Sequence, residues 1–298
     1  HWSLDALLVS SAVDMVASPL MYGAPTRAPW GAPLVMGAAD SAKLHGKGWA
    51  MESDTRTFLC ASVPAACAGN NFSTDVSSTV QRFRRNLGFA AVRGQPSYML
   101  DLDTYGWLGQ PQQLIESHQL WRGLGALLST IASISSDAPR VGTGAKPEVL
   151  SGSLRFPAQI AVFTDSTSLD LTPLSGPQSG SGLGGGCPSW FQNGLKVNAM
   201  TLSTLGTPVL HLATEDLLTE QLDLSNIRLA VFLNAVHLAP EVEAAVRFHF
   251  GDQHPATLVW LGASGLVKNI SEAADNTRPR RLTGLPVRCS FTANSSLS

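Results

Sequence analysis

Short apolar runs alternate with helix-like segments through the first 110 residues of the chain. The pattern predicts a helix-like start at residues 4–13 and then strands and helices in alternation, namely strands at 14–17, within 44–58 and at 97–102, with helices at 32–44 and from Asp75 onward. Parallel strands need a crossover between them, and a helix is the usual crossover. The series therefore predicts an α/β domain with a parallel sheet.

Two later helices in this part have clear apolar faces. The helix after Asp75 places Val76, Val80, Phe83 and Leu87 on one face, which predicts that Arg82, Arg84 and Arg85 lie largely outside. Residues 111–135 carry apolar side chains at helical spacing and predict one long amphipathic helix.

A break follows, and then the alternation restarts. Residues 136–156 mix Pro, Gly, Ser and Lys and are typical of a linker, so we expect one domain at 1–135 and another at 157–298. The second domain is predicted to contain helices at 190–205 and 240–250 and near-continuous apolar strands at 159–163, 209–213, 228–233 and 257–261, with a further short strand at 287–291. This pattern favours a doubly wound α/β domain.

The glycine-rich segment 175–186 does not indicate a nucleotide site. No strand precedes it directly and no Gly-Lys-Ser/Thr follows it. The spacing of Cys and His residues likewise favours no metal site, and no cofactor is expected.

The charge of the chain argues against nucleic-acid binding. The formal net charge is −2, and the one basic cluster, Arg278 to Arg281, is interpreted as a solvated loop. No run reaches the roughly 18 apolar residues of a membrane span, and no cleavable leader is recognised at the start.

Cysteines and glycosylation sequons favour an extracellular or secretory location, with the cytoplasm as the alternative. Cys60 and Cys67 could close a small loop by a disulfide, although a buried thiol is the alternative for each cysteine. Asn-x-Ser sequons begin at Asn71, Asn269 and Asn294.

The segment 44–58 gathers the most chemistry. It passes through a short apolar run to Glu52, with Asp54 and Arg56 close enough to orient that carboxylate. A carboxylate at the carboxyl end of a parallel strand is typical of active sites in α/β barrels. The alternatives are a strand followed by a polar loop, and a structural carboxylate paired with Arg56.

Several phrases of the chain resemble, in the same order, the β-galactosidase-like enzymes of glycoside hydrolase family 42. They are DMVASPLMY (14–22), LHGKGWAMESDTRT (44–57), SYMLDLDTYGW (97–107), RLAVFLNAVHLAPE (228–241) and TLVWLGASGLV (257–267). The resemblance covers nearly the whole chain and implies that Glu52 is the catalytic nucleophile. It also implies that the first domain holds about the last three strands of a (β/α)8 barrel, and that the second is a trimerisation domain with a class I amidotransferase-like, flavodoxin-like fold and no known chemistry.

The resemblance also implies parts that this chain does not supply. The family's general acid/base glutamate comes from the fourth barrel strand, which we expect to lie before His1 with the rest of the N-terminal barrel half. Retaining hydrolysis needs two carboxyl groups about 5 to 5.5 Å apart, and one, Glu52, is recognised here. An open barrel fragment exposes sheet edges, so we expect the missing half or a homo-oligomeric partner to cover them.

Candidate sugar-binding residues surround Glu52 in the sequence. Tyr22, Trp49 and Trp107 could form aromatic platforms for a sugar ring, with core packing as the alternative. Arg56 and Asp103 are candidate polar contacts. The histidines of the second domain show no catalytic or metal spacing and are interpreted as structural.

Three function classes therefore remain. The first is a retaining exo-glycosidase acting on β-galactosides or a similar sugar. The second is a catalytically inactive carbohydrate-binding or oligomerisation derivative, and the third is a small-molecule-binding α/β protein with a vestigial barrel.

Overall fold

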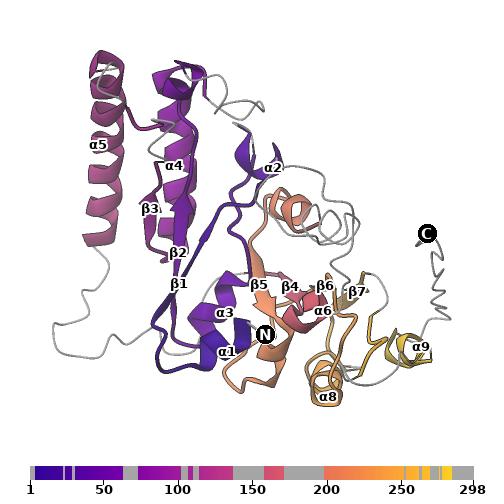
Figure 1. Cartoon of the computed structure of the whole chain (residues 1–298). Helices are drawn as coiled ribbons and strands as arrows, with labels where there is room; N and C mark the ends of the chain where they lie inside the picture. The colour runs from indigo at the N-terminus through magenta and orange to yellow at the C-terminus, as the bar shows by residue number, and fades with distance from the viewer. Residues whose placement is uncertain are drawn as a thin grey trace, which may run out of the picture. The chain divides into compact units, whose positions relative to one another are not determined.

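The chain folds into two compact units, each built on a parallel sheet (Figure 1). The first unit comprises Leu8–Phe156 and Met200–Thr207, and the second comprises His1–Leu7, Pro157–Ala199 and Pro208–Ser298. The computed structural model describes residues 4–22, 24–28, 31–62, 73–101, 107–109, 114–136, 158–170, 198–251, 253–261, 264–268, 275 and 277–283. The predicted α/β class with parallel sheets is confirmed.

The first unit contains a three-stranded sheet in the order β1-β2-β3. Its elements along the chain are α1 (Leu4–Val9, which begins in the second unit), β1 (Met15–Pro19), α2 (Ala24–Arg27), α3 (Ala39–Leu44), β2 (Gly48–Ser53), η1 (Phe58–Ser62), α4 (Val76–Val92), β3 (Ser97–Met99) and α5 (Leu114–Ser136). The strands are short, and each is separated from the next by at least one helix, so they pair in parallel as the pattern predicts.

The strand register places the functional candidates at one level of this sheet. Pro19 pairs with Glu52, and Glu52 pairs with Tyr98. Side chains alternate between the two faces of a strand, so registered neighbours point to the same face. The middle strand β2 is buried along most of its length, with Met51 fully buried.

Helix α4 begins with a well-formed cap. The Asp75 side chain accepts a hydrogen bond from the backbone N–H of Ser78, and the Ser78 hydroxyl oxygen accepts one from the backbone N–H of Asp75. Helix α5 lies beside α4 (Figure 1), where Gly123 allows the two helices to approach, because a side chain there would collide with Val80.

The exposure of the α4 arginines differs from the prediction. Arg84 is exposed, but Arg82 is 3% exposed and Arg85 is half-buried. Arg82 and Arg85 lie on the same side of the helix as the buried Phe83 and Asn86. The prediction was wrong because backbone carbonyl groups from two loops meet these guanidinium groups, which a count of apolar positions does not reveal.

The second unit contains a four-stranded parallel sheet in the order β5-β4-β6-β7. Its elements are β4 (Ile160–Thr164), α6 (Ser166–Asp170), β5 (Val209–Ala213), η3 (Thr214–Leu218), β6 (Leu229–Phe232), α8 (Pro240–His249), β7 (Thr257–Trp260) and α9 (Arg278–Thr283). Residues 198–203 are also helical, and they include Met200 at the point where the chain passes to the first unit. The earlier part of the predicted helix 190–205 and the predicted strand 287–291 lie outside the described residues.

The basic cluster at 278–281 is a helix and not a solvated loop. Arg278 is 6% exposed and donates hydrogen bonds to the carbonyl of Leu238 and to the carboxylate of Glu243, at 3.1 Å and 2.7 Å. The aliphatic part of an arginine side chain can be buried while its guanidinium group stays hydrogen-bonded. Arg278 therefore fixes α9 against α8.

The predicted linker 136–156 begins with the last residue of α5, and 137–156 lie outside the described residues. Among the helices that are described, none is long and apolar enough to cross a membrane.

Candidate functional site

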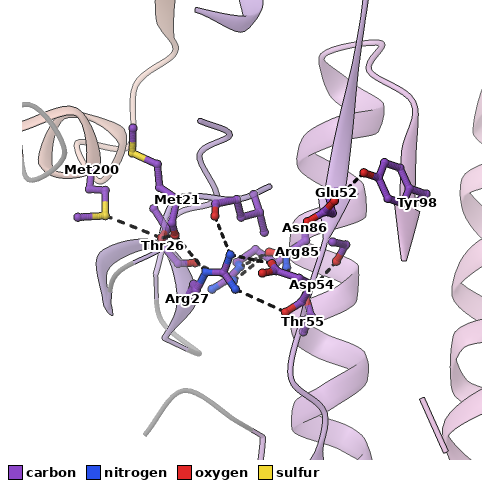
Figure 2. Close-up of polar contacts among 12 residues, drawn as sticks. Met21, Thr26, Arg27, Glu52, Asp54, Thr55, Arg85, Asn86, Tyr98 and Met200 are labelled. Carbon is purple, nitrogen blue, oxygen red and sulfur yellow. Dashed lines mark hydrogen bonds and ion pairs between the residues drawn. The ribbon is translucent and has the colours of Figure 1, made fainter. Parts of the chain in front are cut away.

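The site is built at the carboxyl edge of the first sheet, where all three parallel strands end (Figure 2). Glu52 is the fifth residue of β2 and is half-buried. The hydroxyl of Tyr98 on β3 donates a hydrogen bond to Glu52 Oε2 at 2.6 Å. This short bond fixes one carboxylate oxygen of Glu52.

Two tyrosines face the carboxylates of this edge. The pKa of Tyr98 is raised, first by its hydrogen bond to Glu52 and then by burial. The pKa of Tyr22 is raised first by burial and then by the negative charge of Asp54. Both phenol groups therefore stay protonated at neutral pH and act as hydrogen-bond donors.

Asp54 is bound by Arg27 and does not orient Glu52. Arg27 Nη2 lies 2.7 Å from Asp54 Oδ1, and both side chains are largely buried. The same guanidinium donates to the carbonyls of Leu20 and Met21, and its carbon lies 4.0 Å from the centre of the Tyr22 ring. The ion pair thus joins the segments that follow β1 and β2.

Arg82 and Arg85 support this edge from α4, although the sequence pattern predicted neither as a site residue. Arg82 donates to the carbonyls of Arg56 and Arg27, which come from the segments after β2 and β1. Burial, with the nearby charges of Arg85 and Arg27, lowers the pKa of Arg82 to about 10. Arg82 directly precedes the buried Phe83 and so lies beside the apolar face of the helix, which was the signal that could have indicated its burial.

Arg85 holds the segment after β1 by three backbone carbonyls. Its guanidinium donates to the carbonyls of Thr26, Ala28 and Gly31 at 3.0 Å, 2.6 Å and 2.8 Å. It also donates to the side chain of Asn86, and Asn86 in turn donates to the hydroxyl of Thr55. These bonds fix both the Tyr22 segment and the residues that follow Glu52.

The aromatic candidates divide between the site and the interior. Tyr22 is 44% exposed at the sheet edge. Trp49 is 5% exposed, donates from Nε1 to the hydroxyl of Ser18 at 3.0 Å and closely approaches Gly37. Trp107 is 3% exposed. The buried positions of Trp49 and Trp107 favour the core-packing alternative for both.

Of the two polar candidates, the structure describes Arg56 and places it over the Trp107 ring. The guanidinium carbon of Arg56 lies 5.8 Å from the centre of the Trp107 ring. Asp101 accepts hydrogen bonds from the backbone N–H groups of Trp107 and Leu108 and so fixes that turn. Asp103 lies outside the described residues.

No group of three or more His, Cys, Asp or Glu side chains within the described residues could hold a metal ion.

Cys60 is disulfide-bonded and fully buried, so at this position the cysteine forms a disulfide and is not a buried thiol. The other cysteines, Cys67, Cys187 and Cys289, fall outside the described ranges.

Comparison of the chain with models of protein families, with curated proteins and with solved structures finds no match.

The Tyr98–Glu52 bond predicts a specific change in tyrosine titration. Because Glu52 raises the pKa of Tyr98, we expect Glu52→Gln to lower the pKa of Tyr98 toward its ordinary value near 10. Absorbance of the tyrosinate anion measures the titration, and the step that disappears in Tyr98→Phe identifies Tyr98. An unchanged Tyr98 step in Glu52→Gln would show that the two side chains do not interact in solution.

Proposed function

We propose that this chain is the nucleophile-bearing part of a retaining glycosidase that resembles the family 42 β-galactosidases, with Glu52 as the nucleophile. The observation that carries the proposal is the position of Glu52 on the middle strand, at the carboxyl edge of the parallel sheet, with Tyr98 bound to one of its oxygens. Active sites of α/β barrels form at this edge.

The same proposal covers the finer fold. The first unit is the last three strands of a (β/α)8 barrel, and the second unit is a class I amidotransferase-like, flavodoxin-like trimerisation domain. The sequential order β1-β2-β3 supports the barrel assignment, because neighbouring barrel strands follow each other along the chain. The order β5-β4-β6-β7, in which the chain turns back across β4, is typical of doubly wound sheets.

Glu52 attacks the anomeric carbon and forms a covalent glycosyl-enzyme as the glycosidic C–O bond breaks. The leaving oxygen takes a proton from a general acid, and water later releases the sugar. Asp54 is unsuited to supply that proton, because its carboxylate is engaged by the Arg27 guanidinium at 2.7 Å. The acid/base is therefore assigned to a group outside the described residues.

The test uses a substrate that needs no acid. A dinitrophenyl 2-fluoro-β-galactoside has a leaving group that departs as the stable anion, and its fluorine slows release of the sugar, so the glycosyl-enzyme accumulates. We expect the intact chain to gain one fluorogalactosyl group, located on Glu52 by peptide mass spectrometry. A nitrophenyl β-galactoside, whose leaving group depends more on an acid, should show no turnover with this chain alone.

Two variants control the labelling experiment. Glu52→Gln should abolish the adduct, while Glu116→Gln, which makes the same chemical change at an exposed position of α5, should be labelled like the unaltered chain. Labelling of Glu52→Gln at the same rate, or no labelling of the unaltered chain, would exclude Glu52 as the nucleophile.

The second candidate is a catalytically inactive carbohydrate-binding or oligomerisation protein. The observation that favours it is the ion pair between Asp54 and Arg27. Of the two carboxylates on β2 and in the segment directly after it, Glu52 is then the one that remains for chemistry, whereas retaining hydrolysis needs two. Such a protein would bind galactose in an equilibrium titration without forming the covalent adduct, and sedimentation would report its homo-oligomeric state.

An extracellular or secretory location belongs to the same proposal. The disulfide at Cys60 supports it, because disulfides persist in oxidising compartments. A carbohydrate ligand fits that location.

A further inference from the structure

Acidic side chains meet at the carboxyl edge of the sheet in the second unit. Asp165 follows β4, and Glu215 follows β5 within η3. The hydroxyl of Thr214 lies 3.3 Å from Asp165 Oδ1 and 2.9 Å from Glu215 Oε2, so the two carboxyl groups meet at the same hydroxyl group. That hydroxyl has one proton and can donate it to one of them at a time, and two carboxyl groups this close do not both ionise readily, so the pair retains one proton.

Asp165 is the ionised member of the pair. Burial tends to raise its pKa, but the interactions with His237 and Ser168 outweigh burial, and the pKa of Asp165 is lowered. The backbone N–H of Ser168 donates to Asp165 Oδ2 at 2.6 Å, and His237 Nδ1 lies 3.7 Å from the same oxygen. Asp165 also caps α6, which holds its carboxylate in place.

Glu215 is the protonated member of the pair. Burial raises its pKa to about 8, and the negative charges of Asp5, on α1, and of Asp165 act in the same direction. Glu215 is only half-buried, so its side chain has a path to water.

Other ionisable groups around η3 are engaged elsewhere. Asp216 accepts a hydrogen bond from the backbone N–H of Ala213 at 3.0 Å. His249, from the packed helix α8, contacts the carbonyl of Leu217 through Nε2 at 2.9 Å. When Glu215 ionises, the repulsion that it meets therefore comes from the charges of Asp5 and Asp165.

We propose that Glu215 and Asp165 form a one-proton latch that joins the carboxyl ends of β4 and β5 and that is released when the shared proton leaves. When Glu215 loses its proton, the negative charges of Asp5 and Asp165 repel its carboxylate. In the released state, the Glu215 side chain therefore points away from Asp165 and toward water. The latch is independent of the proposed glycosidase function, because it lies in the other unit and needs no ligand.

The direction of the pH effect follows from linkage. The pKa of Glu215 is higher in the folded chain than its ordinary value of 4.5, so its contribution to stability is complete below about pH 4.5 and is lost as the pH rises through about 8. For one proton, the opening equilibrium constant increases about tenfold from pH 7 to pH 9.

Hydrogen exchange across residues 212–218 tests the latch. After correction for the intrinsic pH dependence of exchange, we expect protection in the unaltered chain to fall about tenfold between pH 7 and pH 9. Glu215→Gln keeps a donor toward Asp165 but cannot ionise, so its protection should stay constant. The matched control Glu241→Gln, at an exposed position of α8, should behave like the unaltered chain.

Two further measurements keep the test decisive if Glu215→Gln does not fold. Asp5→Asn removes one of the charges that raise the pKa of Glu215, so the loss of protection should move to lower pH. In the unaltered chain, the infrared band of a buried protonated carboxyl group should be present at pH 7 and absent at pH 9. Equal protection at both pH values, or no such band at pH 7, would overturn the latch.

Discussion

Replacing Phe232 with alanine is expected to lower the free energy of unfolding of the second unit by about 3–5 kcal/mol. Phe232 is fully buried and is the middle ring of an aromatic row across the sheet. Its ring centre lies 4.9 Å from that of Phe163 and 4.0 Å from that of Trp260, both in stacked orientation. Truncation removes both ring contacts and leaves a cavity on the face of the sheet, between the rings of Phe163 and Trp260.

The strand register explains why the cavity cannot close easily. Phe163 on β4, Phe232 on β6 and Trp260 on β7 are direct partners in the ladder, so backbone hydrogen bonds hold their Cα atoms apart. Urea denaturation, with hydrogen exchange of β4 identifying the transition of this unit, measures the effect. The control is Phe248→Ala on α8, where the ring is 84% exposed and the expected change is within about 0.5 kcal/mol. Equal effects of the two variants would contradict the packing argument.

Replacing Arg85 with methionine is expected to destabilise the first unit by about 2–3 kcal/mol. The change removes three donors from backbone carbonyls, namely those of Thr26, Ala28 and Gly31. Burial lowers the pKa of Arg85, which shows that the buried charge itself has a cost, so the net loss is smaller than the sum of the lost bonds. Methionine has a helix propensity close to that of arginine, so the helix itself should be little affected.

Hydrogen exchange of β2 reports this loss as a decrease in protection of about 30- to 150-fold. Arg84→Met is the matched control, because Arg84 is the preceding residue of the same helix and is exposed. We also expect Arg85→Met to slow fluorogalactosyl labelling of Glu52, since the Tyr22 segment loses its anchor. A decrease in protection as large in Arg84→Met would show that Arg85 acts only through helix propensity.

Local sequence was sufficient for several elements in both units, although the predicted helix 32–44 forms only at Ala39–Leu44 and α2 was not predicted. Helix α8 begins at Pro240 with acidic residues in its first turn, as the sequence predicts, and Asp75 caps α4. Apolar runs of four to six residues between helices gave β2, β4, β5 and β6, because a parallel strand that is covered on both faces needs apolar side chains in both directions.

The partners of charged side chains were not predictable in the same way. Asp54 and Arg56 were expected to orient Glu52 because they are near it in sequence, but Asp54 binds Arg27 and Arg56 lies over Trp107. Tyr98, which binds Glu52, is 46 residues away along the chain. Similarly, Arg278 pairs with Glu243 across 35 residues.

The sequence by itself determined the α/β alternation, the parallel pairing that follows from it and the placement of Glu52 near the end of a strand. Those features depend on side-chain periodicity and on the length of crossovers, which are local properties. Only the tertiary structure decided that Tyr98 holds Glu52, that Arg82 is buried and Arg85 half-buried, and that Asp165 and Glu215 meet at the Thr214 hydroxyl. Each of these depends on the register between strands or on the packing of a helix over a loop, which brings together groups that are distant in sequence and removes them from water.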